Sequence, residues 1–128
     1  MDVVFYRCNH CGNIAIKPFD AGVDLVCCGE KMERLVADSQ EAATEKHIPA
    51  VTRDGNKLHV NIGEVDHPMT PEHYIQFICL VTDDDYTIHQ LDPADAPACD
   101  FVLRDGQVPV KVYAYCNIHG LWVLDMAS

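Results

Sequence analysis

Four cysteines lie before residue 30, and they limit what the first part of this chain can fold into. They form a CxxC turn and an adjacent pair: Cys8, Cys11, Cys27 and Cys28. A polar, alanine-rich stretch follows from residue 37. The segment before it has fewer than about 40 residues, too few to hold a fold by apolar burial alone. Four thiolates can bind zinc or a single iron in a tetrahedral cage, so we expect a metal to stabilise residues 1–36.

The adjacent pair of cysteines sets a geometric problem for that cage. Side chains of neighbouring residues tend to diverge, so aiming both at one metal should distort the tetrahedron unless Gly29 relieves the backbone. From the spacing alone, a zinc knuckle that only holds the fold is as good an interpretation as a functional metal site. His10 lies between two of the cysteines, and we expect it to be an exposed residue without a role at the metal.

Charge and composition exclude several classes of protein. The 128 residues carry a formal net charge of −11, so nucleic acid is a poor partner because its phosphates would be repelled. No apolar run approaches the ~18 residues of a membrane helix, and the first residues do not have the pattern of a signal peptide. We expect a cytoplasmic protein with reduced thiols, in which the seven cysteines indicate metal binding or catalysis instead of disulfides.

The remainder of the chain has the pattern of a β-domain. Runs rich in β-branched and aromatic residues are separated by turn signals, two of which contain Asp-Gly. No segment has a sustained helical stripe, and several short strands at this spacing predict a β-sandwich of immunoglobulin-like architecture. The expected strands are 57–63, 73–81, 86–91, 100–105, 108–116 and 120–126.

A second group of metal ligands centres on the stretch AYCNIHGLW, which offers Cys116 and His119. No other cysteine lies nearby, so their partners must come from distant segments of the chain. The candidates are His47 in EKHIP, and His67 and His73, which flank a single loop and can converge on one point.

Four imidazoles and one thiolate fit a redox metal better than structural zinc, because structural zinc is almost always four-coordinate. Five protein ligands leave one position of an octahedron open. Iron is the natural candidate, although the Irving–Williams order alone favours copper. The thiolate would donate electron density across the metal, and a small oxygen species bound opposite the sulfur could be reduced. His59 and His89 fall inside strand-like runs and are better explained as ordinary polar residues.

These motifs resemble a known family. YRCNHCGN and VCCGEKM are similar to desulforedoxin and to the first domain of desulfoferrodoxin. EKHIP, HPMTPEHYIQ and YCNIHGLW resemble the neelaredoxin domain, the catalytic unit of superoxide reductases. The resemblance covers nearly the whole chain, with the motifs in the order of the two-iron form. It implies a small rubredoxin-like domain at residues 1–36 and a catalytic β-sandwich domain at residues 37–128.

The resemblance also implies the ligands of two irons. The four early cysteines would bind the first as an Fe(SCys)4 centre, with zinc as a possible substitute. The second would have one axial thiolate, Cys116, and the four equatorial imidazoles of His47, His67, His73 and His119. Glu45 would take the sixth position in the resting ferric state, and Lys46 would be the cation beside the open position.

The implied reaction is the reduction of superoxide, with one electron and two protons, to hydrogen peroxide. The family is typically homodimeric, and a rubredoxin would supply the electron. Two alternatives stay open: a non-enzymatic zinc module or electron carrier, which needs only the first four cysteines, and dismutation, which releases oxygen as well as peroxide. Of the other residues, we expect Cys79 and Trp122 in the core and Cys99 as a free surface thiol.

Overall fold

The structure of this chain is a computed structural model that describes residues 3–39 and 44–126, without the side chains of residues 44 and 45. The chain divides into two compact units, Met1–Val36 and Ala37–Ser128, which we call the cysteine unit and the sandwich unit. Within the described residues, no helix has the length and apolar character needed to cross a membrane.

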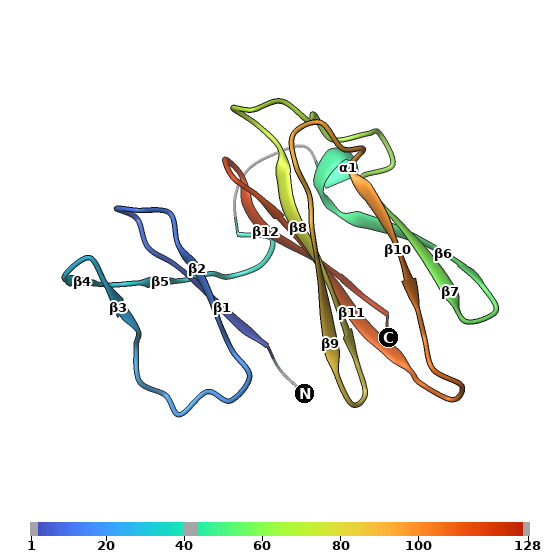
Figure 1. Cartoon of the computed structure of the whole chain (residues 1–128), viewed down its shortest axis with the longest axis horizontal. Coiled ribbons are helices and arrows are strands. Elements are labelled where there is room, and N and C mark those ends of the chain that lie inside the picture. Colours follow the sequence, from blue (N-terminus) through green and yellow to red (C-terminus); the bar gives the residue numbers. More distant parts are fainter. Residues whose placement is uncertain (1–2, 40–43, 127–128) are drawn as a thin grey trace. The chain divides into compact units, whose positions relative to one another are not determined.

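The cysteine unit is built from short strands with little apolar core. Its strands are β1 (Val4–Arg7), β2 (Ile14–Lys17), β3 (Val26–Cys27), β4 (Glu30–Lys31) and β5 (Glu33–Arg34). They form one sheet in the order β2-β1-β5 and a two-stranded ribbon of β3 and β4 (Figure 1). One core cluster consists of Tyr6, Cys8 and Met32, so a ligand of the expected metal is itself part of the core.

The sandwich unit contains one short helix and seven strands among its described residues. These are α1 (Thr44–His47), β6 (Pro49–Asp54), β7 (Lys57–Ile62), β8 (Ile75–Thr82), β9 (Tyr86–Gln90), β10 (Ala98–Val102), β11 (Pro109–Cys116) and β12 (Gly120–Asp125). Two antiparallel sheets result, with the orders β10-β7-β6 and β12-β11-β8-β9 (Figure 1). The predicted mostly-β fold is confirmed.

The core of the sandwich unit lies between its two sheets. In β7 the alternate residues Leu58, Val60 and Ile62 are fully buried, as a half-buried strand requires. Residues of β8, β10 and β11 complete the same cluster. Cys99 belongs to this cluster with only 8% of its surface exposed, so the prediction of a surface thiol was wrong. It fails because β10 begins at Ala98, and strand pairing carries Cys99 inward opposite Val60.

Strand pairing brings four chain segments to one end of the sandwich unit. Pro49, at the start of β6, pairs with Ile62 at the end of β7. In the other sheet, Cys116 at the end of β11 pairs with both Ile75 and Gly120. The loops that leave these strand ends carry the histidines and the cysteine that the sequence singled out.

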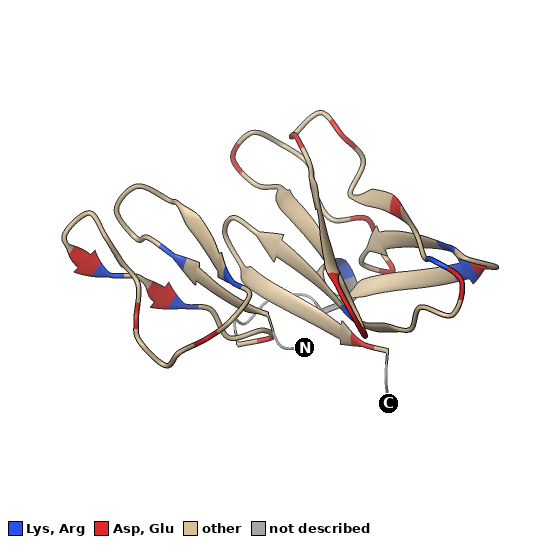
Figure 2. Ribbon diagram, turned by 60° about the horizontal axis from the view of Figure 1, so that its bottom comes forward, with Lys and Arg blue, Asp and Glu red and all other residues tan. Residues whose placement is uncertain are grey.

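Acidic side chains outnumber basic ones in both units. Figure 2 shows Asp and Glu in the loops and at strand ends. Several of the few cations are paired with them, such as Arg104 with Asp84 and Asp85, and Arg34 with Asp20.

Candidate metal centres

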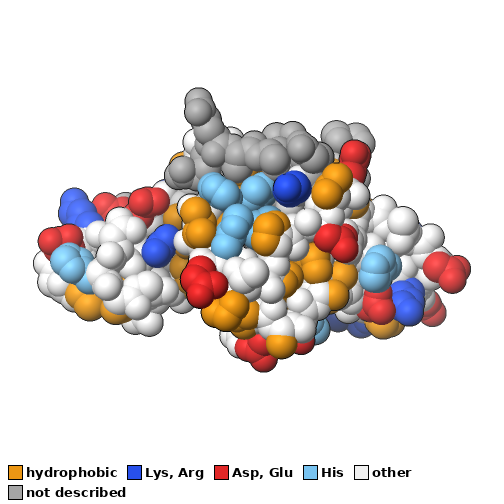
Figure 3. Space-filling view, turned by 90° about the horizontal axis from the view of Figure 1, so that it is seen from above, with side chains coloured by type: hydrophobic (Ala, Val, Ile, Leu, Met, Phe, Trp, Pro, Cys, Tyr) orange, Lys and Arg blue, Asp and Glu red, His pale blue; other side chains and the backbone are white. Residues whose placement is uncertain are grey.

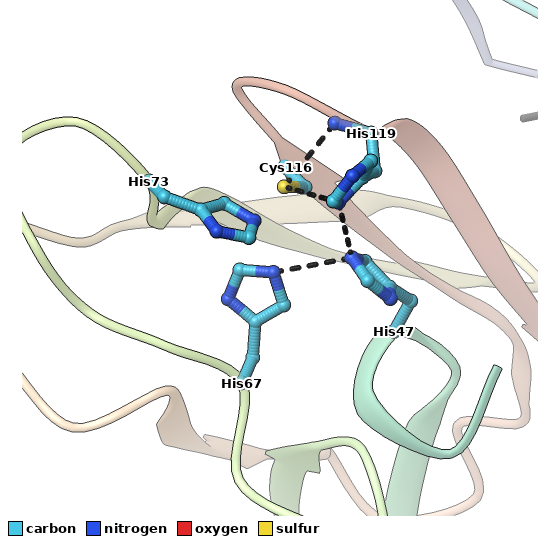
Figure 4. A group of neighbouring side chains, drawn as sticks. All are labelled: His47, His67, His73, Cys116 and His119. Carbon is cyan, nitrogen blue, oxygen red and sulfur yellow. Dashed lines mark hydrogen bonds between the residues drawn. The ribbon is translucent and has the colours of Figure 1, made fainter. Parts of the chain in front are cut away.

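Five side chains from distant segments meet at this end of the sandwich unit. Each contributes one donor atom, and the five atoms all lie within 4.8 Å of one another. Figure 4 shows the group, with the four imidazole rings turned toward a common centre. The residues are His47 from α1, His67 and His73 from the loop before β8, Cys116 from the end of β11 and His119 from the turn before β12.

The four imidazoles form a closed ring of neighbours. Going round the ring, the centroids lie 4.7 Å apart for His47 and His67, 4.7 Å for His67 and His73, 5.0 Å for His73 and His119, and 4.9 Å for His119 and His47. Each pair is nearly perpendicular, with interplanar angles between 78° and 83°. This is a four-sided arrangement with one nitrogen at each corner.

The nitrogen separations fit a metal inside this ring. The Nε2 atom of His47 lies 3.1 Å from Nδ1 of His119 and 3.2 Å from Nε2 of His67. Two nitrogens bound about 2.1 Å from one metal, at right angles to each other, lie about 3.0 Å apart. Neutral rings whose lone pairs face one another at such distances repel unless a cation lies between them.

His67 and His73 show directly that donor atoms point inward. The Nε2 atom of His73 is buried and has no hydrogen-bond partner among the described residues, an arrangement that costs free energy and that a metal would relieve. His67 donates from Nδ1 to the carbonyl of Pro68 at 2.7 Å, which leaves the lone pair on its Nε2 facing the centre. Burial lowers the pKa of His67 to about 4 and also lowers the pKa of His73, so both rings are neutral at neutral pH, as a metal ligand must be.

Cys116 lies next to the imidazole ring and is completely buried. The pairing of β11 with β8 shifts register between Tyr115 and Cys116, so that Cys116 faces Ile75 inside the core. Burial raises the pKa of the Cys116 thiol, and the backbone N–H groups of His119 and Ile118 act in the opposite direction. The N–H of His119 reaches Sγ at 3.4 Å. A buried thiolate at this place needs a cation beside it.

The face of this cluster that reaches the surface adjoins α1. Figure 3 shows His side chains gathered in one patch with hydrophobic side chains around them. His73 and His119 are half-buried, whereas His47 and His67 are buried. Lys46 is half-buried next to His47 in the chain and forms no ion pair with any described residue. The side chain of Glu45 lies outside the described residues, so its predicted role is untouched by the structure.

The four early cysteines form the second group of donors, also with atoms within 4.8 Å of one another. The Sγ atoms of Cys11 and Cys27 lie 3.6 Å apart, and those of Cys27 and Cys28 lie 4.0 Å apart. Four thiolates bound at about 2.3 Å in a tetrahedron lie roughly 3.8 Å apart, so the observed separations fit.

A two-residue turn solves the problem of the adjacent cysteines. Cys28 and Gly29 connect β3 to β4 and have φ angles of 53° and 76°, the pair of positive values that a type I′ hairpin requires. The left-handed backbone at Cys28 turns its side chain back toward Cys27. The side chain of His10 is exposed and paired with Glu30 at 3.0 Å.

The thiols of this group shift one another's pKa values. The backbone N–H of Cys11 lowers the pKa of Cys8 to about 6, whereas hydrogen bonds to the neighbouring thiols raise the pKa of Cys28 to about 12. Four thiolates at this separation repel one another, and a bound cation removes the repulsion. The donor set therefore fits a metal ion, with all-sulfur coordination that suits iron or zinc.

Comparison with known proteins finds a family profile over each of the two units. The family profile described as "Desulfoferrodoxin, N-terminal domain" matches residues 2–35, and the profile described as "Desulfoferrodoxin" matches residues 39–125. The chain belongs to the desulfoferrodoxin family. A desulfoferrodoxin of Clostridium acetobutylicum is 39% identical over 125 residues, which cover 98% of each chain.

Two solved structures extend the comparison of this desulfoferrodoxin-family chain. The superoxide reductase from Treponema pallidum is 32% identical and superposes with a TM-score of 0.84, covering 98% of this chain and 100% of that one. A superoxide reductase from Giardia intestinalis, described as a one-iron form, has a TM-score of 0.56 and is 30% identical; it covers 64% of this chain and 97% of that one. The cysteine unit is too short to account for that match, so most of it lies in the sandwich unit.

Sequence reasoning missed one residue at the family's histidine cluster. Trp122 was expected only to fill the core, and it is indeed 2% exposed. Its ring also lies 4.8 Å from that of His47, and its Nε1–H donates to the carbonyl of His119 at 3.1 Å. The sequence feature that could have indicated this role is the position of Trp122 three residues after His119, because the turn there brings the Trp122 ring back to His47 and His119.

Proposed function

We propose that this chain is a superoxide reductase, which reduces superoxide with one electron and two protons to hydrogen peroxide. The observation that carries the proposal is the closed ring of four inward-facing imidazoles beside one buried thiol. The names of the similar structures from Treponema pallidum and Giardia intestinalis support the same reaction. Proteins that only carry electrons or hold a structural zinc have no use for this second set of donors.

The residues that would hold the catalytic metal are His47, His67, His73, His119 and Cys116. Five protein ligands leave one position for a small substrate, and the family supports iron as the metal. When bound, the iron would supply the electron, and the thiolate would favour its transfer by adding electron density from the buried side.

The protein's own residues would attract the substrate and keep the site ordered. Lys46 offers a cation without an ion-pair partner among the described residues, and superoxide is an anion. The charge of the whole chain is −11 and opposes the encounter, but salt screens charges beyond ~8 Å and leaves a local cation effective. We propose that water held by Lys46 provides the protons, and that Glu45 occupies the substrate position in the resting enzyme.

The cysteine unit would hold a second metal on Cys8, Cys11, Cys27 and Cys28. We propose an Fe(SCys)4 centre, with zinc as the substitute that the same donors accept. Ferric thiolate sites absorb visible light, so the colour of an air-oxidised sample separates iron from zinc.

From the resemblance to the family we also propose a location, an assembly state and an electron donor. Seven free thiols fit a reducing compartment such as the cytoplasm. A rubredoxin-like protein would return the electron, and the chain would form a homodimer. Light scattering on the purified protein measures its mass in solution, and a mass near the 14.3 kDa of one chain contradicts the dimer.

The test of the proposed function is the yield of peroxide. Reduction forms one hydrogen peroxide for each superoxide consumed when an electron donor is present, whereas dismutation forms one for every two and releases oxygen. Superoxide can be generated by pulse radiolysis, and peroxide and oxygen measured afterwards. We expect a ratio of one, without oxygen, and its loss in the variant His67→Ala. A ratio of one half would show that the protein is a superoxide dismutase and not a superoxide reductase.

A further inference from the structure

The side chain of Asn117 holds the backbone on both sides of His73. Its Oδ1 accepts a hydrogen bond from the N–H of Tyr74 at 2.9 Å, and its Nδ2 donates to the carbonyl of Glu72 at 3.0 Å. The backbone N–H of Asn117 donates to the carbonyl of Tyr74 at 3.2 Å. Three hydrogen bonds therefore join the residue after Cys116 to the two neighbours of His73.

These bonds extend the sheet beyond its last strand pair. The pairing of β11 with β8 ends where Cys116 lies opposite Ile75. One residue further on, the carboxamide of Asn117 presents one donor and one acceptor, as a peptide group of an added strand would. A hydrocarbon side chain of the same size could not do this.

The other edge of the His73 segment is also fixed. His73 and Thr70 form an isolated antiparallel bridge, in which each N–H donates to the other's carbonyl at 3.0 and 3.1 Å. His73 itself is thus held by Thr70, and its neighbours are held by Asn117 from the opposite side. With hydrogen bonds on both edges, the backbone that carries the His73 ring is held in place.

We infer that Asn117 is a positioning residue for the catalytic metal: it locks the loop carrying His73 to the turn carrying Cys116 and His119. This inference rests on the proposed function for its purpose, since a five-ligand site needs these three donors in fixed register. Asn117 is not one of the five clustered donors, so it would act through the residues that carry them. Its loss would let His73 move independently of the other ligands. Partners of metal ligands at this remove typically change metal affinity by about 10–100-fold when mutated.

The test is the bonding state of His73 in zinc-loaded full-length protein, read from the 15N shifts of the imidazole nitrogens by NMR. Zinc serves as a diamagnetic probe of this site. In the parent protein, Nε2 of His73 should have the shift of a metal-bound nitrogen. In Asn117→Ala we expect a free His73 population, and zinc affinity at the histidine cluster about 10–100-fold lower in competition with a chelator. Asn117→Asp keeps the acceptor for Tyr74 and loses the donor to Glu72, so it should also weaken zinc binding.

The matched control is Asn56→Ala. Asn56 likewise joins two loops of the sandwich unit through its carboxamide, which donates to Asp105, but it lies in the β6–β7 turn away from the cluster. The Asn56→Ala variant should lose thermal stability, but its His73 should stay bound to zinc. In the His73→Ala background, Asn117→Ala should lower zinc affinity no further.

A bound His73 and a zinc affinity within twofold of the parent, in either Asn117 variant, would overturn the inference. So would an equal loss of affinity in Asn56→Ala, because the effect would then be general destabilisation. The zinc readout does not depend on superoxide chemistry. If the protein proves not to reduce superoxide, the proposed function fails while the role of Asn117 is still decided by these spectra.

Discussion

At the scale of single residues, the histidine cluster is a set of polar groups that makes sense only around a cation. The Nε2 atom of His73 is buried without a hydrogen-bond partner among the described residues, which costs free energy in the metal-free fold. Burial raises the pKa of the Cys116 thiol, so a thiolate at this place needs a cation beside it. The donor atoms of the cluster lie within 4.8 Å of one another, as the ligands of one metal ion would.

Lys46 gives a prediction at this scale. Lys46→Ala should slow the second-order reaction with superoxide about three- to tenfold, the effect of the roughly 1 kcal/mol between two unit charges about 4 Å apart in water. The rate should also become less sensitive to salt, because the local attraction is gone. Stopped-flow or pulse-radiolysis rates at several salt concentrations measure both effects.

Lys57→Ala is the matched control for Lys46→Ala, because both variants have the same net charge. Lys57 is the first residue of β7 and pairs with Asp54 at the end of β6, roughly 17 Å along the sheet from the start of β6. Its replacement should leave the rate nearly unchanged. Equal slowing in the two variants would show that total charge, and not a local cation, governs the encounter.

At the scale of elements, the sequence predicted those strands whose own residues alternate between apolar and polar or form an apolar run. The alternation in β7 and the apolar run of β8 led directly to buried strands. β6 was missed because half of its residues are exposed and its buried partners lie in β7. Strands of two residues, such as β3 and β4, are too short to have a pattern. Cys27 lies in β3 and Cys28 in the turn between the two strands, so the cysteine group fixes their place.

The site was more predictable than the elements that carry it. The donors could be named from the sequence because few other roles suit Cys116 with His119, and the remaining histidines were limited in number. Contacts beyond the donors could not be named. The hydrogen bonds of Asn117 cross 43 and 45 residues of sequence, and only the register of β8 against β11 brings those partners together.

Two turns of the sandwich unit share a network that should make its stability depend on pH. The Nε2 group of Gln107 donates to Asp84 at 2.8 Å, and with Thr82 and Arg104 it lowers the pKa of Asp84 below its ordinary value of 3.8. A depressed carboxyl pKa contributes stability above the ordinary value, and this contribution is lost as pH falls through the lower, folded-state pKa.

The prediction concerns the difference between the parent and Asp84→Asn. The parent should be more stable at pH 6, and the difference should shrink as the pH falls below about 4. Urea unfolding at a series of pH values measures it. Asp92→Asn, a change of one exposed acid outside the network, should not reproduce this pH dependence. A difference that grows toward acid would mean that the sign of the Asp84 shift is wrong.

At the scale of the whole molecule, two units with separate cores and separate sets of donors share one chain. The double variant Cys11→Ser, Cys28→Ser removes the two exposed ligands of the cysteine unit and leaves the buried Cys8 in its core. We expect iron content to fall from two ions per chain to one. Peroxide formation from superoxide in a single turnover should remain within about twofold, since the donors proposed for the catalytic metal all lie in the sandwich unit. Loss of that reaction would show that the first metal is required for it.

The central claim is that four imidazoles and one thiolate hold a single iron in the sandwich unit. X-ray absorption at the iron edge of the Cys11→Ser, Cys28→Ser double variant tests this claim most directly, because only the second site should be filled. The account predicts one sulfur neighbour together with nitrogen or oxygen neighbours that include four imidazoles. A spectrum with no sulfur, or with two or more, would contradict it.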